Sequence, residues 1–340
     1  MTVSQREETT EMKVAVLGAS GLVGREMLKV MAERNFPIDE LKMLSGPGSA
    51  GKTCVYQGKE YVYEQASDSS FEGMDIVLGA AENAVAKQFA PAIKAAGAVF
   101  IDNSSAFRLD ADVPLVVPEI NPEDALKHSG IIANPNCVTI IAAVAVGGIA
   151  KLSPIKSMTA SSYQAVSGAG RNGLYELEEQ VQAYAKGEEL VSKAFPCQIA
   201  FNLIPKIGDI TENGYSKEEM KLQNEGRKIL HLPDMKVSCT CVRVPVFRSH
   251  SISINLLTEK KISVEEAKDA IAKFPGAVLL DDAANNEFPT PLLTSDQDLV
   301  YVGRVREDLT NGGIALWCCG DQIRKGAATN AVQIAELLVR

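Results

Sequence analysis

Short apolar runs alternate with amphipathic segments over the first 137 residues of the chain. Residues 12–35 begin with an apolar run, pass through three glycines and continue with apolar positions at helical spacing. This pattern predicts a strand, a turn and a helix. Residues 83–97 predict another amphipathic helix, and buried strands are expected at 41–45, 75–81, 98–105, 115–120 and 130–137. Alternating strands and helices are typical of an α/β fold with a parallel, doubly wound sheet.

The second half of the chain has longer apolar runs. Residues 137–152 are apolar nearly throughout and predict a helix that begins at or directly after Cys137. A strand, a loop of small residues at 167–173 and a helix are expected next, followed by a polar helix at 216–230 with Ser216 as its N-cap. Further strand-like segments could form one broad sheet: 237–246, 251–257, 299–307 and 313–320.

Size and charge narrow the class of protein. A chain of 340 residues exceeds one ordinary hydrophobic core, so two domains are expected. The formal net charge of −9 leaves no basic surplus for binding nucleic acid, and no apolar run approaches the ~20 residues that span a membrane. Residues 1–11 are polar and lack the apolar segment of a secretory signal, which predicts a disordered leader on a cytoplasmic protein.

The cysteines and histidines do not predict a metal site. Seven cysteines are scattered along the chain without a C-x-x-C pair, and the three histidines have no zinc-type spacing to them. Four cysteines lie in apolar, strand-like segments and are expected to pack in the core: Cys239, Cys241, Cys318 and Cys319.

Gly18, Gly21 and Gly24 form a G-x-x-G-x-x-G turn between the first strand and the first helix. Glycine permits a tight turn and close approach of a pyrophosphate, whose charge the amides at the helix N-terminus receive. The turn opens a strand–helix series, which favours a dinucleotide site over a glycine turn without a ligand. No carboxylate follows the second strand to bind a ribose 2′-hydroxyl. Its absence favours NADP over NAD, unless residues 45–52 are merely a glycine-rich loop.

Three polar segments follow strands of the predicted sheet, at residues 18–24, 103–108 and 134–137. Ligands of doubly wound sheets bind beyond the carboxyl ends of the strands. We therefore expect these segments to converge on one crevice, with Cys137 facing a bound nucleotide.

Cys137 is the candidate nucleophile. A thiol at a helix N-terminus gains thiolate character from the helix dipole, but this feature alone leaves a buried structural cysteine equally acceptable. His250 is either a structural histidine or an acid/base partner for that thiolate. Gln164 is a polar residue at a strand end, and alternation in the strand around Arg243 directs that side chain to one face.

Six motifs occur in order along nearly the whole chain: "DNSSAFR", "NPNC", "SYQAVSGAG", "EEMK", "RVPVFRSHS" and "RKGAATNAVQIAE". In these motifs the chain resembles the aspartate-β-semialdehyde dehydrogenase family. The resemblance implies a Rossmann-type NADP-binding domain over residues 12–136 plus 321–340. It also implies an α+β domain with a mixed sheet over residues 137–320, which binds the substrate and forms a homodimer or a homotetramer.

The resemblance implies a reductase of an acyl phosphate. The family converts L-aspartyl-4-phosphate and NADPH into L-aspartate-4-semialdehyde, phosphate and NADP, on the route to lysine (through diaminopimelate), threonine, methionine and isoleucine. In the reverse sense, Cys137 adds to the aldehyde as a thiolate, and His250 takes the hemithioacetal proton while hydride leaves. Phosphate then cleaves the thioester, and Gln164 positions the substrate beside the thiol.

The same resemblance implies roles for further residues. Arg243 would bind the substrate carboxylate, a bidentate role that lysine fills poorly, and Glu218 would contact the substrate amine. Arg108 and Lys221 would bind phosphate, with Asn136 beside the thiol. Cofactor contacts are implied for Gly18, Ser20, Gly21, Leu22, Val23, Gly48, Ser49, Ser167, Gly168 and Asn330.

Two departures from the family pattern concern the cofactor. Family members commonly have an arginine just before the Ser-Ala-Gly-Lys segment, where it holds the 2′-phosphate, and this chain has Gly48 there. Many members have a Ser-Ala-Gly-Gly turn where this chain has "LGAAEN", in which Glu82 is a candidate partner for a ribose hydroxyl. NADP is the expected cofactor, with NAD as the alternative.

Three other functions compete with this interpretation. N-acetyl-γ-glutamyl-phosphate reductase, or another acyl-phosphate reductase, has related architecture, but its nucleophile usually lies in Gly-Cys-Tyr, where this chain has Asn136, Cys137 and Val138. A cofactor-free cysteine hydrolase or acyltransferase would leave the glycine turn unexplained. A dinucleotide-sensing binding protein would leave the candidate substrate-binding cations without a role.

Overall fold

The computed structural model describes residues 12–339, so the leader predicted at residues 1–11 lies outside the described residues. The described chain forms two compact units. In residue numbers, the first unit comprises 12–114, 122–134 and 331–339, and the second comprises 115–121 and 135–330. Three segments of the second unit lie within the range predicted for the nucleotide-binding domain: 115–121, 135–136 and 321–330.

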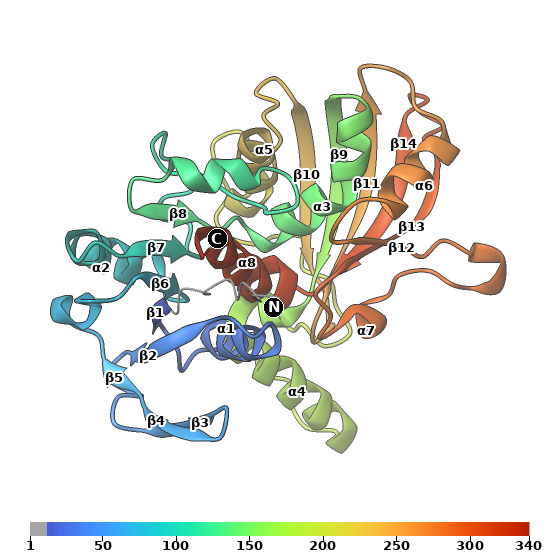
Figure 1. The fold of residues 1–340 in the computed structure, drawn as a ribbon. Coiled ribbons are helices and arrows are strands. Elements are labelled where there is room, and N and C mark those ends of the chain that lie inside the picture. Colours follow the sequence, from blue (N-terminus) through green and yellow to red (C-terminus); the bar gives the residue numbers. More distant parts are fainter. Residues whose placement is uncertain (1–11, 340) are drawn as a thin grey trace, which may run out of the picture. The chain divides into compact units, whose positions relative to one another are not determined.

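The first unit is built on a six-stranded sheet in the order β5-β2-β1-β6-β7-β8 (Figure 1), and every pairing in it is parallel. Its strands are β1 (Met12–Leu17), β2 (Ile38–Ser45), β5 (Glu64–Gln65), β6 (Ile76–Gly79), β7 (Val99–Asp102) and β8 (Ile131–Ala133). The predicted parallel sheet is confirmed. Central strands such as β6 are buried on both faces, which is why their sequences are continuous apolar runs instead of alternating ones.

Helices and short turns connect these strands. They are α1 (Leu22–Glu33), η1 (Asp68–Phe71), α2 (Asn83–Ala95) and η2 (Pro122–Lys127), with α8 (Thr329–Leu338) at the end of the described chain. A hairpin that was not predicted, β3 (Thr53–Tyr56) and β4 (Lys59–Val62), follows β2 as a separate two-stranded sheet.

The strand predicted at residues 115–120 is wrong. Pro118 has no amide to donate to a strand ladder. The side chain of Asn121 takes over the neighbouring backbone groups instead, because its Oδ1 accepts from the Val117 amide at 2.9 Å and its Nδ2 donates to the Leu115 carbonyl at 2.9 Å. This apolar segment is therefore buried as a turn.

The second unit contains a mixed six-stranded sheet in the order β10-β9-β11-β14-β13-β12. Its strands are β9 (Ile155–Gln164), β10 (Lys236–Arg243), β11 (His250–Thr258), β12 (Ala277–Leu279), β13 (Val300–Glu307) and β14 (Ile314–Gly320). The pairs β10–β9 and β12–β13 are parallel and the others are antiparallel. The prediction of one broad, mixed sheet is confirmed, and β9 lies between the two strands that carry Arg243 and His250.

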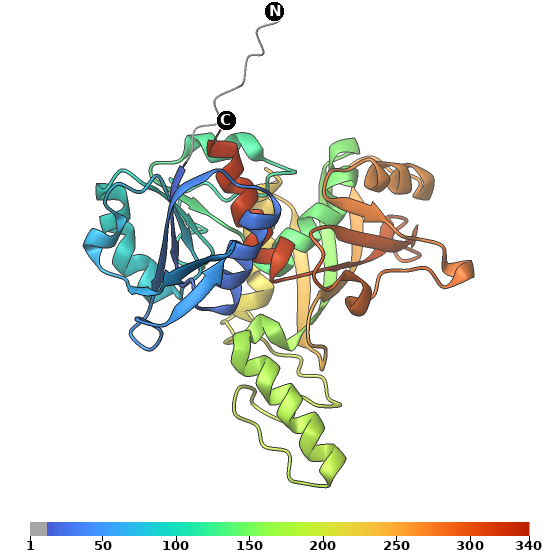
Figure 2. The same cartoon turned by 60° about the horizontal axis from the view of Figure 1, so that its bottom comes forward.

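Five helices belong to the second unit: α3 (Cys137–Leu152), α4 (Gly170–Lys186), α5 (Lys217–Ile229), α6 (Val264–Ala272) and α7 (Pro291–Thr294). Three short turns accompany them: η3 (Val166–Ala169), η4 (Ala283–Asn285) and the π-helical η5 (Arg324–Ala328). Helix α3 begins at Cys137, as predicted. Helix α4 begins at Gly170, inside the segment expected to be a loop, and Figure 2 shows α4 and the following loop extending beyond one end of the second sheet.

Helix α3 is buried on nearly all sides, from Val138 to Ile149. An all-apolar helix of this kind belongs in the interior. Two adjacent glycines allow close packing of α6 and the segment after it: a Cβ at Gly147 would lie 2.4 Å from the Phe274 ring, and one at Gly148 would lie 2.4 Å from the Ala270 carbonyl oxygen. This packing fixes the register of α3.

Gly24 provides a test of the glycine turn. A Cβ at this position would lie 2.3 Å from the Gly18 carbonyl oxygen and 2.8 Å from the Ala19 Cα. Gly24→Ala should therefore lower stability by about 1–3 kcal/mol through overpacking, measured as a lower midpoint of thermal unfolding. Gly48→Ala is the matched control, because a Cβ there would meet nothing within 4 Å. Equal midpoints for the two variants would contradict the proposed packing.

Candidate active site

The glycine turn of the first unit forms a cradle for an anion. Gly18 has a φ of +92°, and a Cβ on it would lie 2.6 Å from the Ala80 carbonyl oxygen, so only glycine fits. Helix α1 begins at Leu22, and its N-cap, Gly21, makes no side-chain hydrogen bond to the first turn. The first-turn amides, which include Val23, therefore keep their capacity to bind a negatively charged group such as a pyrophosphate.

The loop after β2 contains no carboxylate. In this loop the Ser49 amide donates to the Gly46 carbonyl at 3.1 Å, and the Lys52 ammonium donates to the Gly48 carbonyl at 2.9 Å. Gly48 and Lys52 are exposed. The only charged side chain that the loop presents is therefore a cation, which suits a 2′-phosphate better than a 2′-hydroxyl. Glu82, the other candidate partner for the ribose, is at the N-cap position of α2.

The segment 103–108 is folded around a buried carboxylate. Asp102 accepts hydrogen bonds from the Ser104 amide at 3.0 Å and the Ser104 hydroxyl at 2.6 Å. Burial raises the pKa of Asp102, against the opposing effects of these hydrogen bonds and of Arg108. The Arg108 guanidinium donates to the carbonyls of Asn134 at 2.9 Å and Asn103 at 2.7 Å.

The predicted convergence holds for the parts that lie in the first unit. The Asn103 amide and side chain donate to the Gly79 carbonyl at 3.1 and 2.8 Å, and Gly18 lies against the adjacent Ala80. Asn134 donates from its side chain to the Asn103 side chain at 2.6 Å. The glycine turn, the 103–108 segment and Asn134 therefore meet at the carboxyl edge of the first sheet.

Cys137 is the first residue of α3, and Asn136 is its N-cap. The Asn136 side-chain oxygen accepts from the amides of Val138 at 3.0 Å and Thr139 at 3.4 Å. This cap satisfies backbone donors that would otherwise have no partner, and it fixes where the helix begins. The thiol is thus at the positive end of a buried 16-residue helix, a position that stabilises a thiolate.

Glu218 connects several predicted site residues. One carboxylate oxygen accepts from the Asn136 side chain at 2.9 Å and the Gln164 side chain at 3.3 Å. The other accepts from Lys221 at 2.8 Å. Burial opposes the ionisation of Glu218, but the Lys221 ammonium and these hydrogen bonds outweigh it and lower its pKa to about 2. Glu218 is consequently an anion at neutral pH.

The buried residue Ala165 joins Arg243 to His250 through its peptide groups. The Arg243 guanidinium donates to the Ala165 carbonyl at 2.7 Å, and the Ala165 amide donates to Nδ1 of His250 at 3.1 Å. Burial lowers the pKa of Arg243, while electrostatic interactions with Cys137 and Glu218 oppose that effect. Thiol, guanidinium and imidazole therefore belong to one electrostatic cluster in the second unit.

The environment of His250 determines its charge and its tautomer. Burial, followed by the nearby Arg243, lowers its pKa to about 3, although Glu218 acts in the opposite direction. Because the backbone amide of Ala165 points at Nδ1, that nitrogen must present its lone pair, and the proton of the neutral ring is assigned to Nε2. Among the described residues Nε2 is a buried polar atom with no hydrogen-bond partner. It is a donor available to a ligand.

The loop after β9 fits closely against these groups. A Cβ at Gly168 would lie 2.7 Å from Arg243 Nη1 and 3.1 Å from His250 Cε1, so only glycine lets the loop approach them. The Ser167 hydroxyl accepts a hydrogen bond from the Gln322 side chain. Asn330, which was predicted to reach the nicotinamide, accepts from Lys325 at 2.9 Å and donates to the Val116 carbonyl at 3.0 Å; its cofactor contact stays a prediction.

Some residues around the site were not predicted. The Gln322 side chain accepts a hydrogen bond from the Ser249 amide at 2.8 Å. Ser249, the residue directly before His250, has a φ of 73°, a backbone conformation that is rare for residues other than glycine. Lys325 is fully buried and donates to both oxygens of Glu119 at 2.8 and 2.7 Å. The next residue, Gly326, lies against Cys137, because a Cβ there would be 2.9 Å from the Cys137 Cβ.

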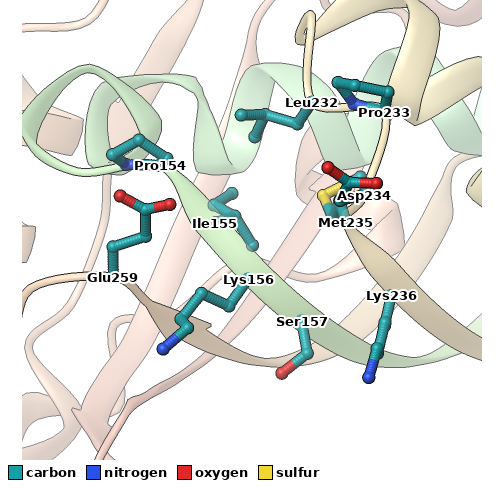
Figure 3. A pocket seen from close by; sticks show the side chains of 10 residues that line it. All are labelled: Pro154, Ile155, Lys156, Ser157, Leu232, Pro233, Asp234, Met235, Lys236 and Glu259. Carbon is teal, nitrogen blue, oxygen red and sulfur yellow. The ribbon is translucent and has the colours of Figure 1, made fainter.

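A pocket of about 420 Å³ lies at the opposite end of β9 and β10, lined by residues that include Lys156, Asp234 and Lys236 (Figure 3). Gln164 and Arg243 end these strands, so at ~3.3 Å per residue the pocket is about 25 Å from them. It is separate from the candidate active site.

Among the described residues, 12–339, no group of three or more histidine, cysteine, aspartate or glutamate side chains could hold a metal ion. No helix in this part of the chain has both the length and the apolar character needed to cross a membrane.

Two family models match the chain. One is described as the semialdehyde dehydrogenase NAD binding domain and matches residues 13–128; the other is the semialdehyde dehydrogenase dimerisation domain and matches residues 146–325. Aspartate-semialdehyde dehydrogenase of Aquifex aeolicus is 50% identical over 333 residues, which are 96% of this chain and 98% of that protein. The Bacillus subtilis enzyme is 44% identical over 334 residues, 96% of each chain.

Solved structures with a similar fold are also aspartate semialdehyde dehydrogenases. Aspartate semialdehyde dehydrogenase II of Vibrio cholerae, complexed with ASA, has a TM-score of 0.95 and 42% identity, and the match covers 97% of this chain and 99% of that one. The Candida albicans aspartate semialdehyde dehydrogenase with NADP has a TM-score of 0.75 and 25% identity, with 97% and 98% covered.

The assigned tautomer of His250 can be tested by ¹⁵N NMR of histidine-labelled protein. The His250 ring should remain neutral with its proton on Nε2 from pH 8 to pH 5, because burial and Arg243 hold its pKa at about 3. The spectrum of the same protein unfolded in urea serves as the reference. A proton on Nδ1, or titration of His250 near its ordinary pKa of ~6.5, would contradict the assignment.

A stability measurement follows from the same shift. The unfolded chain takes up the His250 proton below pH ~6.5, whereas the folded chain does so only near pH 3, so this group's stabilisation decreases as pH falls between those values. Between pH 6.5 and 5 the loss should be about 1.5 kcal/mol. His250→Gln should lack this part of the pH dependence in urea unfolding, and an unchanged dependence would contradict the shift.

Proposed function

The chain belongs to the aspartate-semialdehyde dehydrogenase family, and we propose that it reduces L-aspartyl-4-phosphate with NADPH through a thioester on Cys137. The supporting observation is the arrangement around Cys137: a thiol at the start of a buried helix, with Arg243 in electrostatic contact. His250 and Gln164 are linked to the same cluster by hydrogen bonds.

The residues of the first unit fit a dinucleotide. The glycine turn leaves no room for a side chain at Gly18, and the first turn of α1 has no side-chain cap, which are the features that a bound pyrophosphate requires. Bound NADPH would supply the hydride of the reaction. Ser20, Leu22 and Val23 would contact its pyrophosphate, and Ser167 and Gly168 would form the second cofactor-binding loop.

The proposed sequence begins at the thiolate of Cys137. Its sulfur attacks the acyl carbon of the substrate, the carbon–sulfur bond forms and phosphate leaves. Hydride addition then converts the thioester carbonyl into a hemithioacetal oxyanion. The oxyanion collapses to the aldehyde as the carbon–sulfur bond breaks, which regenerates the thiolate without an added proton.

His250 would serve this sequence as a hydrogen-bond donor. Its Nε2 carries the proton of the neutral ring and has no partner among the described residues, so it is suited to donate to the developing oxyanion. A donor that is fixed in advance stabilises such charge strongly in a buried site. This role differs from the proton acceptor that the family resemblance implied, because the lone pair of the ring is directed at Ala165.

Arg243, Glu218 and Lys221 would bind the charged groups of the substrate. Arg243 would bind the carboxylate, since its guanidinium is held by the Ala165 carbonyl and keeps its charge. Glu218 and Lys221 form an ion pair at 2.8 Å. The substrate's ammonium would replace Lys221 at Glu218, and Lys221 would then bind the phosphate. The family resemblance implies the same role for Arg108.

We also propose the wider context of the enzyme. The match to a dimerisation domain supports a homodimer or a pair of dimers. The seven cysteines include no disulfide in the described residues, which accords with a reducing cytoplasm. The product would feed the synthesis of lysine, diaminopimelate, threonine, methionine and isoleucine.

Replacing the nucleophile tests the proposed function. Cys137→Ser should lower kcat for phosphate-dependent oxidation of aspartate semialdehyde by at least about a thousandfold, because a serine hydroxyl does not ionise at neutral pH. Binding of NADPH, followed by its fluorescence, should be unchanged. Cys197→Ser, at an exposed thiol, is the control and should keep full activity. Near-normal turnover by Cys137→Ser would remove the nucleophile assignment.

The choice of NADPH over NADH can be tested at Lys52. If this cation binds the 2′-phosphate, Lys52→Met should raise KM for NADPH by about tenfold or more, the effect of losing a charged hydrogen bond. KM for NADH should not change. Lys59→Met, at the start of β4 in the neighbouring β3–β4 hairpin, is the control. Equal effects on both cofactors would contradict a 2′-phosphate contact.

A further inference from the structure

Helix α5 presents two carboxylates to the turn that carries the nucleophile. Glu225 follows Glu218 by seven residues, about two helical turns, so both side chains extend from one face of α5. Glu218 accepts from the side chain of Asn136. Glu225 accepts from the backbone amide of the same residue, with 2.6 Å between Oε2 and the nitrogen.

The contact made by Glu225 is buried and charge-assisted. Only 2% of Glu225 is exposed, so the carboxylate is held away from water, where a hydrogen bond to an ionised acceptor is short and strong. Its partner amide lies at the N-terminus of α3, whose dipole favours a negative charge. The bond is therefore a strong restraint on the peptide group of Asn136.

The restraint acts on the residue directly before Cys137. Asn136 is bonded on three sides: its amide by Glu225, its side-chain nitrogen by Glu218 and its side-chain oxygen by the first amides of α3. Without the Glu225 bond, the peptide group between Pro135 and Asn136 could rotate even while the Asn136 side chain still capped α3. The direction in which Cys137 leaves that turn would then vary.

We propose that Glu225 is a positioning residue that holds Asn136 so that the Cys137 thiolate is aimed at the acyl carbon of the substrate. The proposal rests on the proposed function in taking Cys137 as the nucleophile. In this proposal Glu225 orients Cys137 and does not promote ionisation of its thiol. A carboxylate near Cys137 disfavours the thiolate, so any benefit to catalysis must come from orientation.

Two variants separate geometry from charge. Glu225→Gln keeps an acceptor oxygen and removes the charge, whereas Glu225→Met keeps the length of the side chain and removes the acceptor. The matched control is Glu219→Met on the same helix, because Glu219 also accepts backbone amides, from Cys241 at 2.9 Å and Ser216 at 2.6 Å, but does not contact Asn136.

Three measurements are made on each full-length variant: kcat and KM for aspartate semialdehyde, the thermal midpoint, and the pH profile of Cys137 alkylation by iodoacetamide, followed by mass spectrometry of its peptide. Glu225→Met should lose about tenfold to a hundredfold in kcat, the scale of a misdirected nucleophile, with KM within about twofold. Glu225→Gln should keep kcat within about threefold. Both should alkylate at lower pH than wild type, since both lose the neighbouring negative charge.

The proposal is overturned if Glu225→Met keeps kcat, or loses no more than Glu219→Met does, because the role of Glu225 would then be structural only. It is also overturned if Glu225→Gln loses as much kcat as Glu225→Met, or if neither variant shifts the alkylation profile. A wild-type protein inactive on aspartate semialdehyde would instead refute the proposed function. The alkylation profiles would still report the Glu225 contact in that case.

Discussion

The start of helix α3 is the constraint on which the candidate active site depends. Asn136 caps the helix with its side chain, and two carboxylates of α5 bond its amide and its side-chain nitrogen. The rest of α3 is buried on nearly all sides, so its register cannot shift by one residue without a rotation of about 100° that moves every apolar contact. Cys137 is thereby fixed from both sides of the capped turn.

Buried charges in the second unit serve this geometry. Removing one member of a buried ion pair leaves an uncompensated charge and costs about 3–5 kcal/mol. Lys325 is fully buried with Glu119, and the π-helical turn that contains it brings Gly326 against Cys137. A buried ion pair of this kind adds little net stability compared with apolar packing. Its effect here is to hold the turn of residues 324–328 in place beside Cys137.

Short sequence patterns predicted the features that are determined by residues close together along the chain. The glycine turn, the start of α3 at Cys137 and the strands of one mixed sheet follow from short patterns, and the structure contains them. The segment 115–120 has the composition of a strand, but Pro118 and the side chain of Asn121 direct its backbone into a turn. Its apolar character reports burial and not strand pairing.

Other features depend on contacts between distant residues, and local patterns do not contain them. Glu225 reaches the amide of a residue 89 positions earlier, and its spacing from Glu218 shows only that the two share a helix face. The Ala165 amide that fixes the His250 ring comes from the backbone, which carries no side-chain signature. The insertion of β9 between β10 and β11 likewise appears only in the strand order.

The charges around Cys137 explain why a neutral histidine suits this site. Arg243 and Lys221 bring positive charge to this cluster, and Glu218 brings a negative charge. A cationic His250 beside Arg243 would place like charges together in a buried setting, and burial together with Arg243 lowers its pKa to about 3. Arg243 and the amides of α3 would stabilise a thiolate at Cys137, while the neutral ring keeps a proton on Nε2. A reducible carbonyl adjacent to that sulfur would meet a hydrogen-bond donor that neither competes for the thiolate nor changes its charge near neutral pH.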